Sequence, residues 1–335
     1  MTIRQRFDAF AKAIRPDDDT IREARRQVEH LESRLHDLVS EDETFTLVKI
    51  LRAGSNAKHT SLVETDDNSW DVDLGAYFTG EGATKDDFDE LLTFTEDQIR
   101  KVYPQKDPDD IKAERSAVRL KFKTGIKLNV DVAPIIADDA LHVENRGWIP
   151  RKDGYRLTSV TAHNGFVRGR SSDSDDVAGP VKFNRLVRLY KWWNNRLPDD
   201  LRMPSIFCDH VVAAAVDRMG GVTDQWQTSV RELFRFVSQV HRLEAPIVFG
   251  DYYDPSDAVI PAVPVVIMDV VNPENNVAAK LDLTSKRDRY VSAAQDAYDA
   301  ASYARTLELD DEIEEAVDVW CEVFGPDFRI RSNPD

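Results

Sequence analysis

The sequence predicts an α+β protein with two lobes, a mixed-sheet lobe at residues 1–180 and a helical lobe at residues 181–335. Two patterns support this division. Strand-like alternation of apolar and polar residues lies mainly in the first half of the chain, whereas apolar spacings of three and four dominate after residue 181. The length of 335 residues also suits two domains, because single domains commonly hold about 50 to 250 residues.

The first lobe begins with a long amphipathic helix, predicted at residues 20–39. Its apolar residues recur every three or four positions and therefore share one helical face. They are Ile21, Ala24, Val28, Leu31, Leu35 and Leu38. A strand is predicted next at residues 44–52, and a second helix at residues 85–103.

Two further strands are predicted close together in the sequence. Residues 117–123 alternate between polar and apolar types, and alternation resumes in the segment that contains Asp131. Thr124 and Gly125 separate the two segments, and a two-residue link of this kind indicates a hairpin.

The stretch from residue 165 to residue 180 is rich in glycine, serine and aspartate. This composition predicts a mobile loop, with a plain linker as the alternative. Helices are then predicted at residues 181–197, 205–219, 226–243, 285–307 and 310–324. The change from strands to helices is the basis for the second lobe.

Three aspartates are the candidate catalytic residues. Asp71 and Asp73 lie two positions apart in a strand whose intervening residues are apolar, so both point to the same side. Asp131 occupies the matching position in a later strand and can join the pair if the two strands are neighbours. Carboxylates so close need a counter-cation, and Mg²⁺ is typical of such oxygen-rich sites. Two such ions can activate a hydroxyl and stabilise a leaving pyrophosphate.

A glycine-serine turn, Gly54-Ser55, precedes the acid pair. Backbone amides around such a glycine can form a concave site for phosphate oxygens. A lone Asp-x-Asp or Gly-Ser is more often an ordinary polar strand face or turn. The order of helix, strand, Gly-Ser turn, acid pair and third acid instead favours a nucleotide-polymerising site.

The composition limits where the protein works and what it binds. The net charge of −17 disfavours broad attraction to a nucleic-acid backbone. Cys208 and Cys321 lack metal-ligand spacing and suggest no disulfide framework, which predicts a reducing, cytoplasmic location. No segment resembles a signal peptide or an apolar membrane span, so no membrane association is expected.

These motifs resemble the bacterial cGAS/DncV-like nucleotidyltransferases (CD-NTases) of CBASS anti-phage systems, within the DNA polymerase beta-like superfamily. The resemblance covers nearly the whole chain. Beyond Gly54-Ser55 and the three acids, the family's order is kept by the segments TSVTAHNGF, LVRLYKWWNN, MPSIF and MDVVNPENNVA. The pattern is most similar to the members encoded beside HORMA-domain and AAA-type ATPase regulators. The resemblance implies a nucleotidyltransferase catalytic lobe at residues 1–180, N-terminal helices included, and an oligoadenylate-synthetase-like helical lobe at residues 181–335.

The resemblance also implies roles for individual residues. Asp71, Asp73 and Asp131 would hold two Mg²⁺ ions, for which Mn²⁺ can substitute, with Asp131 also drawing off the proton of the attacking hydroxyl. The implied nucleotide contacts are Gly54, Ser55, Lys58, Lys191 and Ser205. His59 departs from the family, which usually has glycine there, and is expected to be a loop residue rather than a base.

The implied reaction joins nucleoside triphosphates, ATP above all, into a cyclic di- or trinucleotide. A linear oligoadenylate synthase and a terminal RNA nucleotidyltransferase would share the same acids. A catalytically silent nucleotide-binding regulator is the alternative of another class. The expected protein partners are a HORMA-domain activator and an AAA-type ATPase regulator.

The sequence does not decide whether nucleic acid activates the protein. A basic cluster at Lys182, Arg185, Arg188 and Lys191 could contact nucleic acid, but the preferred interpretation is a solvated helix face that attracts ATP. Asn272, Asn275 and Asn276 are expected to form turns. Tyr77 shares the side of the acid pair, whereas Trp192 and Trp193 are expected in the core.

Overall fold

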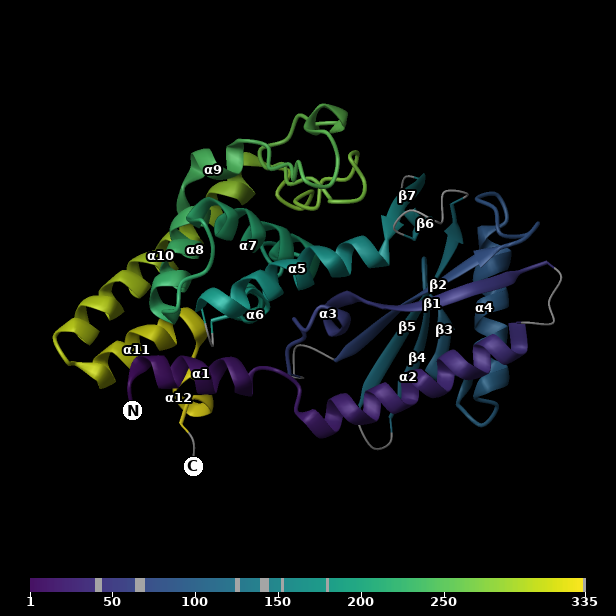
Figure 1. Cartoon of the computed structure of the whole chain (residues 1–335), viewed down its shortest axis with the longest axis horizontal. Helices are drawn as coiled ribbons and strands as arrows, with labels where there is room; N and C mark the ends of the chain where they lie inside the picture. Colours follow the sequence, from purple (N-terminus) through teal and green to yellow (C-terminus); the bar gives the residue numbers. More distant parts are fainter. Residues whose placement is uncertain are drawn as a thin grey trace. The chain divides into compact units, whose positions relative to one another are not determined.

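The computed structural model describes residues 1–39, 44–63, 70–123, 127–138, 145–151, 154–178 and 181–333. Contacts divide the chain into two units (Figure 1). The sheet unit comprises residues 16–165, and the helical unit comprises residues 1–15 together with residues 166–335. This division differs from the prediction. The predicted boundary lay at residue 180, and all residues before it were assigned to the first lobe.

The sheet unit is built on one mixed sheet, as predicted. Its described strands are β1 (Thr46–Ala53), β2 (Asp71–Thr79), β3 (Ile111–Ala113), β4 (Val118–Phe122), β5 (Leu128–Ala137), β6 (Arg146–Arg151) and β7 (Gly154–Ser159). The order is β1-β2-β5-β4-β3, and β6 pairs with both β5 and β7. β2 and β5 run parallel, while the other pairs are antiparallel. The predicted Thr124-Gly125 turn lies outside the described residues.

One face of this sheet is covered by α2 (Asp18–Val39) and α4 (Phe88–Val102) (Figure 1). Leu31 of α2, Leu91 of α4 and Leu74 of β2 belong to one buried cluster. The alternate residues of β2, β4 and β5 supply the strand side of this core because side chains alternate across a sheet. The polar residues of these strands consequently point to the opposite face.

The helical unit contains nine α-helices of the described residues, long and short. They are α1 (Ile3–Ala13), most of α5 (Val160–Ala178), α6 (Phe183–Asn195), α7 (Ser205–Met219), α8 (Trp226–Ser238), α9 (Val240–Glu244), α10 (Thr284–Leu309), α11 (Ile313–Phe324) and α12 (Asp327–Arg331). The predicted helix at residues 226–243 is divided in two, because Gln239 takes an extended conformation between α8 and α9. In the described part of the chain, none of the helices combines the length and apolar character needed to span a membrane.

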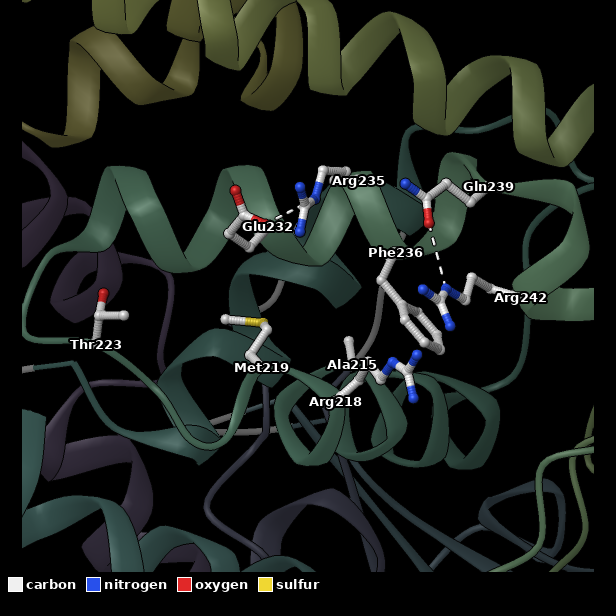
Figure 2. Close-up of a pocket in the computed structure, with 9 residues that line it drawn as sticks. All are labelled: Ala215, Arg218, Met219, Thr223, Glu232, Arg235, Phe236, Gln239 and Arg242. Carbon is white, nitrogen blue, oxygen red and sulfur yellow. Dashed lines mark hydrogen bonds and ion pairs between the residues drawn. The ribbon is translucent and has the colours of Figure 1, made fainter.

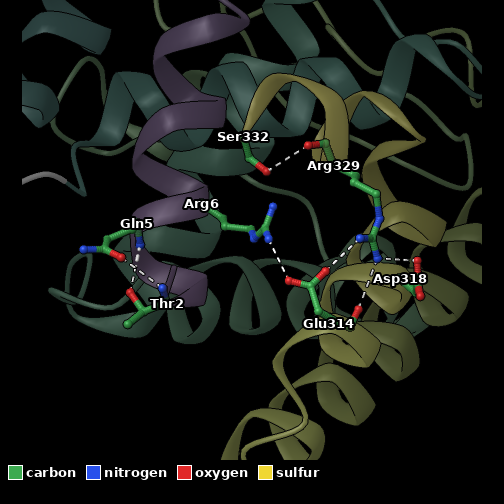
Figure 3. A network of polar contacts seen from close by, with 7 residues as sticks. All are labelled: Thr2, Gln5, Arg6, Glu314, Asp318, Arg329 and Ser332. Atoms are coloured by element: carbon green, nitrogen blue, oxygen red, sulfur yellow. Dashed lines mark hydrogen bonds and ion pairs between the residues drawn. The ribbon is translucent and has the colours of Figure 1, made fainter. Parts of the chain in front are cut away.

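Helix α1 packs within the helical unit, and this explains the first correction to the predicted lobes. The Phe7 ring lies 4.8 Å from that of Trp320 and 5.0 Å from that of Phe328. Such edge-to-face pairs add to the apolar burial of both rings. A polar network continues the contact: Arg6 bonds Glu314 at 2.8 Å, and Glu314 accepts a second bond from Arg329 at 2.8 Å (Figure 3).

The second correction concerns residues 165–180, which were predicted to be a loop. Helix α5 extends through residue 178 instead. The Ser171 and Ser174 hydroxyls donate to carbonyls of the preceding turn, each at 2.7 Å, and Ser174 also accepts from the Phe183 amide of α6 at 3.0 Å. The guanidinium of Arg170 lies 4.2 Å from the centre of the Phe166 ring. Composition alone did not reveal these helical contacts.

The segment Met268 to Ala278 forms turns, as predicted. Asp269 accepts hydrogen bonds from the Val271 amide and the Asn275 side chain, at 2.8 and 3.0 Å. Asn272 accepts from the Glu274 amide at 2.9 Å. These side chains hydrogen-bond to groups a few residues along the chain and so stabilise turns in place of a regular strand pairing.

Candidate active site

The register of β2 and β5 brings the predicted acids together. Asp73 pairs with Asp131 across the two parallel strands, and Asp71 pairs with Asn129. Paired residues of adjacent strands lie about 4.8 Å apart and point to the same face. All four are partly exposed, whereas Val72 and Val130 between them are buried in the core. We call the surface formed by these four residues and Arg119 the acid face.

Arg119 is a member of the acid face that the sequence analysis missed. It lies opposite Asp131 in the antiparallel pairing of β4 and β5. Its guanidinium donates two hydrogen bonds to the Asp131 carboxylate, at 2.9 and 2.8 Å, and also pairs with Glu114 at 2.8 Å. The bond to Asp131 raises the pKa of Arg119 above its ordinary value. The alternation of β4 contained the signal, because Arg119 lies between the apolar residues Val118 and Leu120.

Asn129 supports the other end of the acid face. Its side-chain amide donates to Asp71 Oδ1 at 2.8 Å. A neutral donor in this position stabilises the charged carboxylate without supplying a counter-charge. Asp71 and Asp131 therefore have different partners, an amide for the first and a guanidinium for the second.

The Gly54 turn lies directly against Asp73. β1 ends at Ala53, which pairs with Asp73, and the one-turn helix α3 (Gly54–Ala57) follows. Gly54 has φ +65°, and a Cβ atom there would lie 1.7 Å from Asp73 Oδ2. Both the backbone conformation and the missing side chain require glycine. The turn is thus held beside the carboxylate, as the sequence pattern requires.

The remaining residues of this turn are compactly packed. Ser55 Oγ lies 3.2 Å from Ser61 Oγ, and Lys58 is buried. His59 adopts φ +56°, a left-handed conformation that glycine takes more readily. The replacement of the family's usual glycine therefore leaves a glycine-like backbone at this position.

The acid face fits a divalent metal in its chemistry and register. Asp71, Asp73 and Asp131 supply carboxylate oxygens, the ligands that Mg²⁺ prefers. In their present side-chain conformations, the described residues contain no group of three His, Cys, Asp or Glu side chains close enough together to hold a metal ion. The hydrogen bonds from Arg119 and Asn129 still leave acceptor capacity, because each carboxylate oxygen has two lone pairs.

Lys191 and Ser205 belong to the helical unit. Lys191 lies on α6 with its side chain only 5% exposed, and its Nζ is 3.0 Å from Asp209 Oδ1. Ser205 is the exposed first residue of α7. The neighbouring Cys208 thiol is fully buried, which raises its pKa to about 12. Lys191 therefore has a buried carboxylate partner in this structure.

One expectation about exposed residues needs correction. The basic cluster is not a solvated helix face, because Arg188 and Lys191 are buried and Arg188 donates to the Ala11 carbonyl at 3.3 Å. Tyr77 is fully buried, and its hydroxyl accepts from the Val160 amide at 3.1 Å, so its ring is not a stacking surface. Trp192 and Trp193 are buried, as predicted.

Comparisons with known proteins identify relatives of the whole chain. The profile of the Second Messenger Oligonucleotide or Dinucleotide Synthetase domain matches residues 1–163. The cyclic AMP-AMP-AMP synthase of Escherichia coli (strain MS 115-1) is 31% identical over 91% of both chains. The structure of the E. coli MS115-1 CdnC:HORMA-deltaN complex matches with a TM-score of 0.81 and 28% identity, over 97% of this chain and 98% of that chain. The Vibrio cholerae DncV cyclic AMP-GMP synthase shares the fold, with a TM-score of 0.70 at 11% identity over 98% and 97% of the two chains.

The fold and the acid face define a nucleotidyltransferase of the polymerase beta-like type. More narrowly, the chain belongs to the CD-NTase family of CBASS oligonucleotide cyclases, enzymes that make cyclic oligonucleotides in anti-phage defence. The resemblance seen in the sequence is thereby confirmed.

Proposed function

We propose that this enzyme joins ATP into a cyclic oligoadenylate, with cyclic triadenylate as its main product. The observation that carries the proposal is the set of three aspartates on neighbouring strands β2 and β5, with the Gly54 turn against Asp73. The relatives support the choice of nucleotide, because one is named a cyclic AMP-AMP-AMP synthase and a matching solved structure is titled CdnC + ATP. The coverage of 91% of both chains extends this support beyond the catalytic unit.

Asp71, Asp73 and Asp131 are proposed to hold two Mg²⁺ ions, with Mn²⁺ as a substitute. When bound, such ions polarise phosphoryl oxygens and stabilise the leaving pyrophosphate. The protein supplies the strand register that keeps the three carboxylates on one face. Asp131 is also the proposed acceptor of the proton from the attacking ribose hydroxyl, since a carboxylate oxygen is a suitable base.

The Gly54 turn is proposed to orient the donor triphosphate. Its amides and the Ser55 hydroxyl are donors of the kind that phosphate oxygens accept. Lys58 would add positive charge to this turn, and Lys191 with Ser205 would contact the triphosphate from the helical unit. Lys191 must then exchange its ion pair with Asp209 for the phosphate. Orientation of the reacting groups lowers the barrier by removing motional freedom before the reaction.

A HORMA-domain protein is the proposed activator, because a matching structure is titled as a complex of CdnC with such a protein. An AAA-type ATPase is proposed as a further regulator. The cytoplasm is the proposed compartment, and the free thiols of Cys208 and Cys321 suit a reducing environment.

Product analysis tests the proposed reaction. The purified chain, alone and with a co-encoded HORMA protein, is incubated with labelled ATP, GTP, CTP and UTP plus Mg²⁺, and the products are treated with phosphatase and exonuclease. We expect an adenine product that resists both enzymes and has the mass of cyclic triadenylate. The Asp71→Asn/Asp73→Asn variant is the control and should yield none. A product with a free end would instead identify a linear synthase or a terminal transferase.

The silent-regulator alternative makes a different prediction for the same assay. It requires ATP binding without release of pyrophosphate, in the presence of the HORMA protein. Pyrophosphate release that depends on Asp71 and Asp73 excludes this alternative. Product formed equally by the double variant would refute the assigned site.

A further inference from the structure

The helical unit contains a cavity of about 280 Å³ that the proposed reaction does not use. It lies between the C-terminal end of α7, the helix α8 and the short helix α9 (Figure 2). Arg218, Arg235 and Arg242 line it, one from each helix. None of the lining residues belongs to the candidate active site.

The cavity has an excess of positive charge. Glu232 is the acidic residue among its lining, and Arg231 and Arg235 already share its carboxylate, at 3.0 and 2.8 Å. Across the described parts of the chain, neither Arg218 nor Arg242 forms an ion pair. Arg242 donates to the side chain of Gln239 at 3.3 Å. In a chain with a net charge of −17, such a cavity offers a local site for an anion.

An aromatic ring lies within this group of charges. Phe236 is partly buried on α8, and its ring lines the cavity together with Arg218 and Arg242 (Figure 2). Met219 adds an apolar side chain to the lining. Guanidinium groups bind phosphate through paired hydrogen bonds, and an aromatic ring provides a surface for a nucleobase. The cavity therefore combines the two features that recognise a nucleotide.

We propose that this cavity binds a nucleoside phosphate at a second site, separate from the catalytic acids. Arg218 and Arg242 contact the phosphate, and Phe236 contacts the base. The volume lies near the lower end for small-molecule sites and suits one nucleotide unit rather than a whole cyclic trinucleotide. The unit can belong to a free nucleotide or to one residue of a cyclic product, since both present the same phosphate and base.

Binding of fluorescent mant-AMP tests this proposal. The Asp71→Asn/Asp73→Asn protein is used in EDTA, so metal-dependent binding at the catalytic acids does not contribute. We expect saturable binding that weakens at least about tenfold in Arg218→Gln/Arg242→Gln, equivalent to about 1.4 kcal/mol. Arg4→Gln/Arg289→Gln removes the same charge from exposed positions of the helical unit and should change the affinity less than about twofold.

A second variant tests the role of the ring. Phe236→Leu keeps an apolar side chain, so it should weaken mant-AMP binding while leaving competition by inorganic pyrophosphate unchanged. Circular dichroism and urea unfolding establish that each variant is folded. Competition by ATP or by cyclic triadenylate then identifies the source of the bound unit.

Three results would overturn the proposal. The first is that mant-AMP does not bind at millimolar concentration. The second is that both double-arginine variants weaken mant-AMP binding equally. The third is that Phe236→Leu leaves mant-AMP binding unaffected. Absent nucleotide binding together with capture of polyglutamate by Arg218 and Arg242 would assign the cavity to an acidic protein partner. Because the assay uses a catalytically inactive protein, its failure leaves the proposed reaction untouched.

Discussion

The pair between Arg119 and Asp131 should contribute measurably to the stability of the sheet unit. Its two charge-assisted bonds join side chains that are 31% and 17% exposed. Exposed pairs contribute about 0 to 1 kcal/mol, and hydrogen bonds to charged groups contribute about 1.5 to 3 kcal/mol. The partial exposure of Arg119 places the expected coupling energy between these limits, at about 1 to 2 kcal/mol.

A double-mutant cycle isolates this coupling. Arg119→Gln leaves Asp131 beside Asp73 without its guanidinium, so it should destabilise the fold at neutral pH. Asp131→Asn should cost less, because it also removes the repulsion between neighbouring carboxylates. Urea unfolding in EDTA gives the free energies of the two single variants and the double variant. Coupling within about 0.5 kcal/mol of zero, the range of simple additivity, would refute the reasoning.

The Arg119→Gln variant should bind a divalent metal ion more tightly than the wild-type protein. Loss of a positive charge beside the carboxylates removes a repulsion that, for each unit of metal charge about 4 Å away, amounts to between about 1 kcal/mol in water and about 4 kcal/mol near a protein surface. With Arg119 partly exposed, we expect about a fivefold gain in Mn²⁺ affinity, corresponding to about 1 kcal/mol. Mn²⁺ titration followed by water-proton relaxation measures the affinity directly, without activity. An unchanged or weaker affinity would contradict the expected effect of Arg119.

Gly54→Ala should lower the rate of product formation by about 100-fold, because the new Cβ displaces the Asp73 carboxylate, a proposed metal ligand, by about 1 Å or more. Gly169→Ala, which meets open space on α5, is its control and should retain full activity; equal activity of the two variants would contradict the steric account. The arginine bonds to Glu314 lower the pKa of that carboxyl, so its stabilisation is complete above its ordinary value of 4.5 and is lost as pH falls through the lowered folded-state value. Glu314→Gln, measured by urea unfolding from pH 7 to pH 3, should therefore cost about 0.5 kcal/mol at neutral pH, with a difference from wild type that shrinks on acidification; a difference that grows there would have the wrong sign. Iodoacetamide at pH 8 should modify Cys321 and leave Cys208 unmodified in the native protein, because burial raises the pKa of the Cys208 thiol to about 12; peptide mass spectrometry decides, and rapid labelling of Cys208 would show that its surroundings open.

The face on which the acids lie was predictable from local alternation. Val72 and Val130 had to enter an apolar core, so their polar neighbours Asp71, Asp73 and Asp131 had to leave it. The sequence required only that the two strands be adjacent, and the parallel pairing of β2 and β5 confirmed this. The glycine at position 54 was likewise predictable as a turn residue.

The errors arose where tertiary packing outweighed composition. Gly165, Gly169 and the serines of α5 favour a loop by propensity, yet the serine hydroxyls bond within the helix and Arg170 packs on Phe166. Helix α1 precedes the sheet in sequence but packs its aromatic residues into the helical unit. Propensity is a weak guide when distant side chains supply most of the burial.

The sequence by itself determined the mixed sheet, the positions of Asp71, Asp73 and Asp131 on one strand face, and the glycine turn before them. These features depend on periodicity and backbone sterics, which act between near neighbours. Only the tertiary structure decided that Arg119 bonds Asp131, that Lys191 is buried against Asp209, and that three helices place arginines around one cavity. Such pairings join residues from separate elements, so they depend on how the elements pack and not on any local pattern.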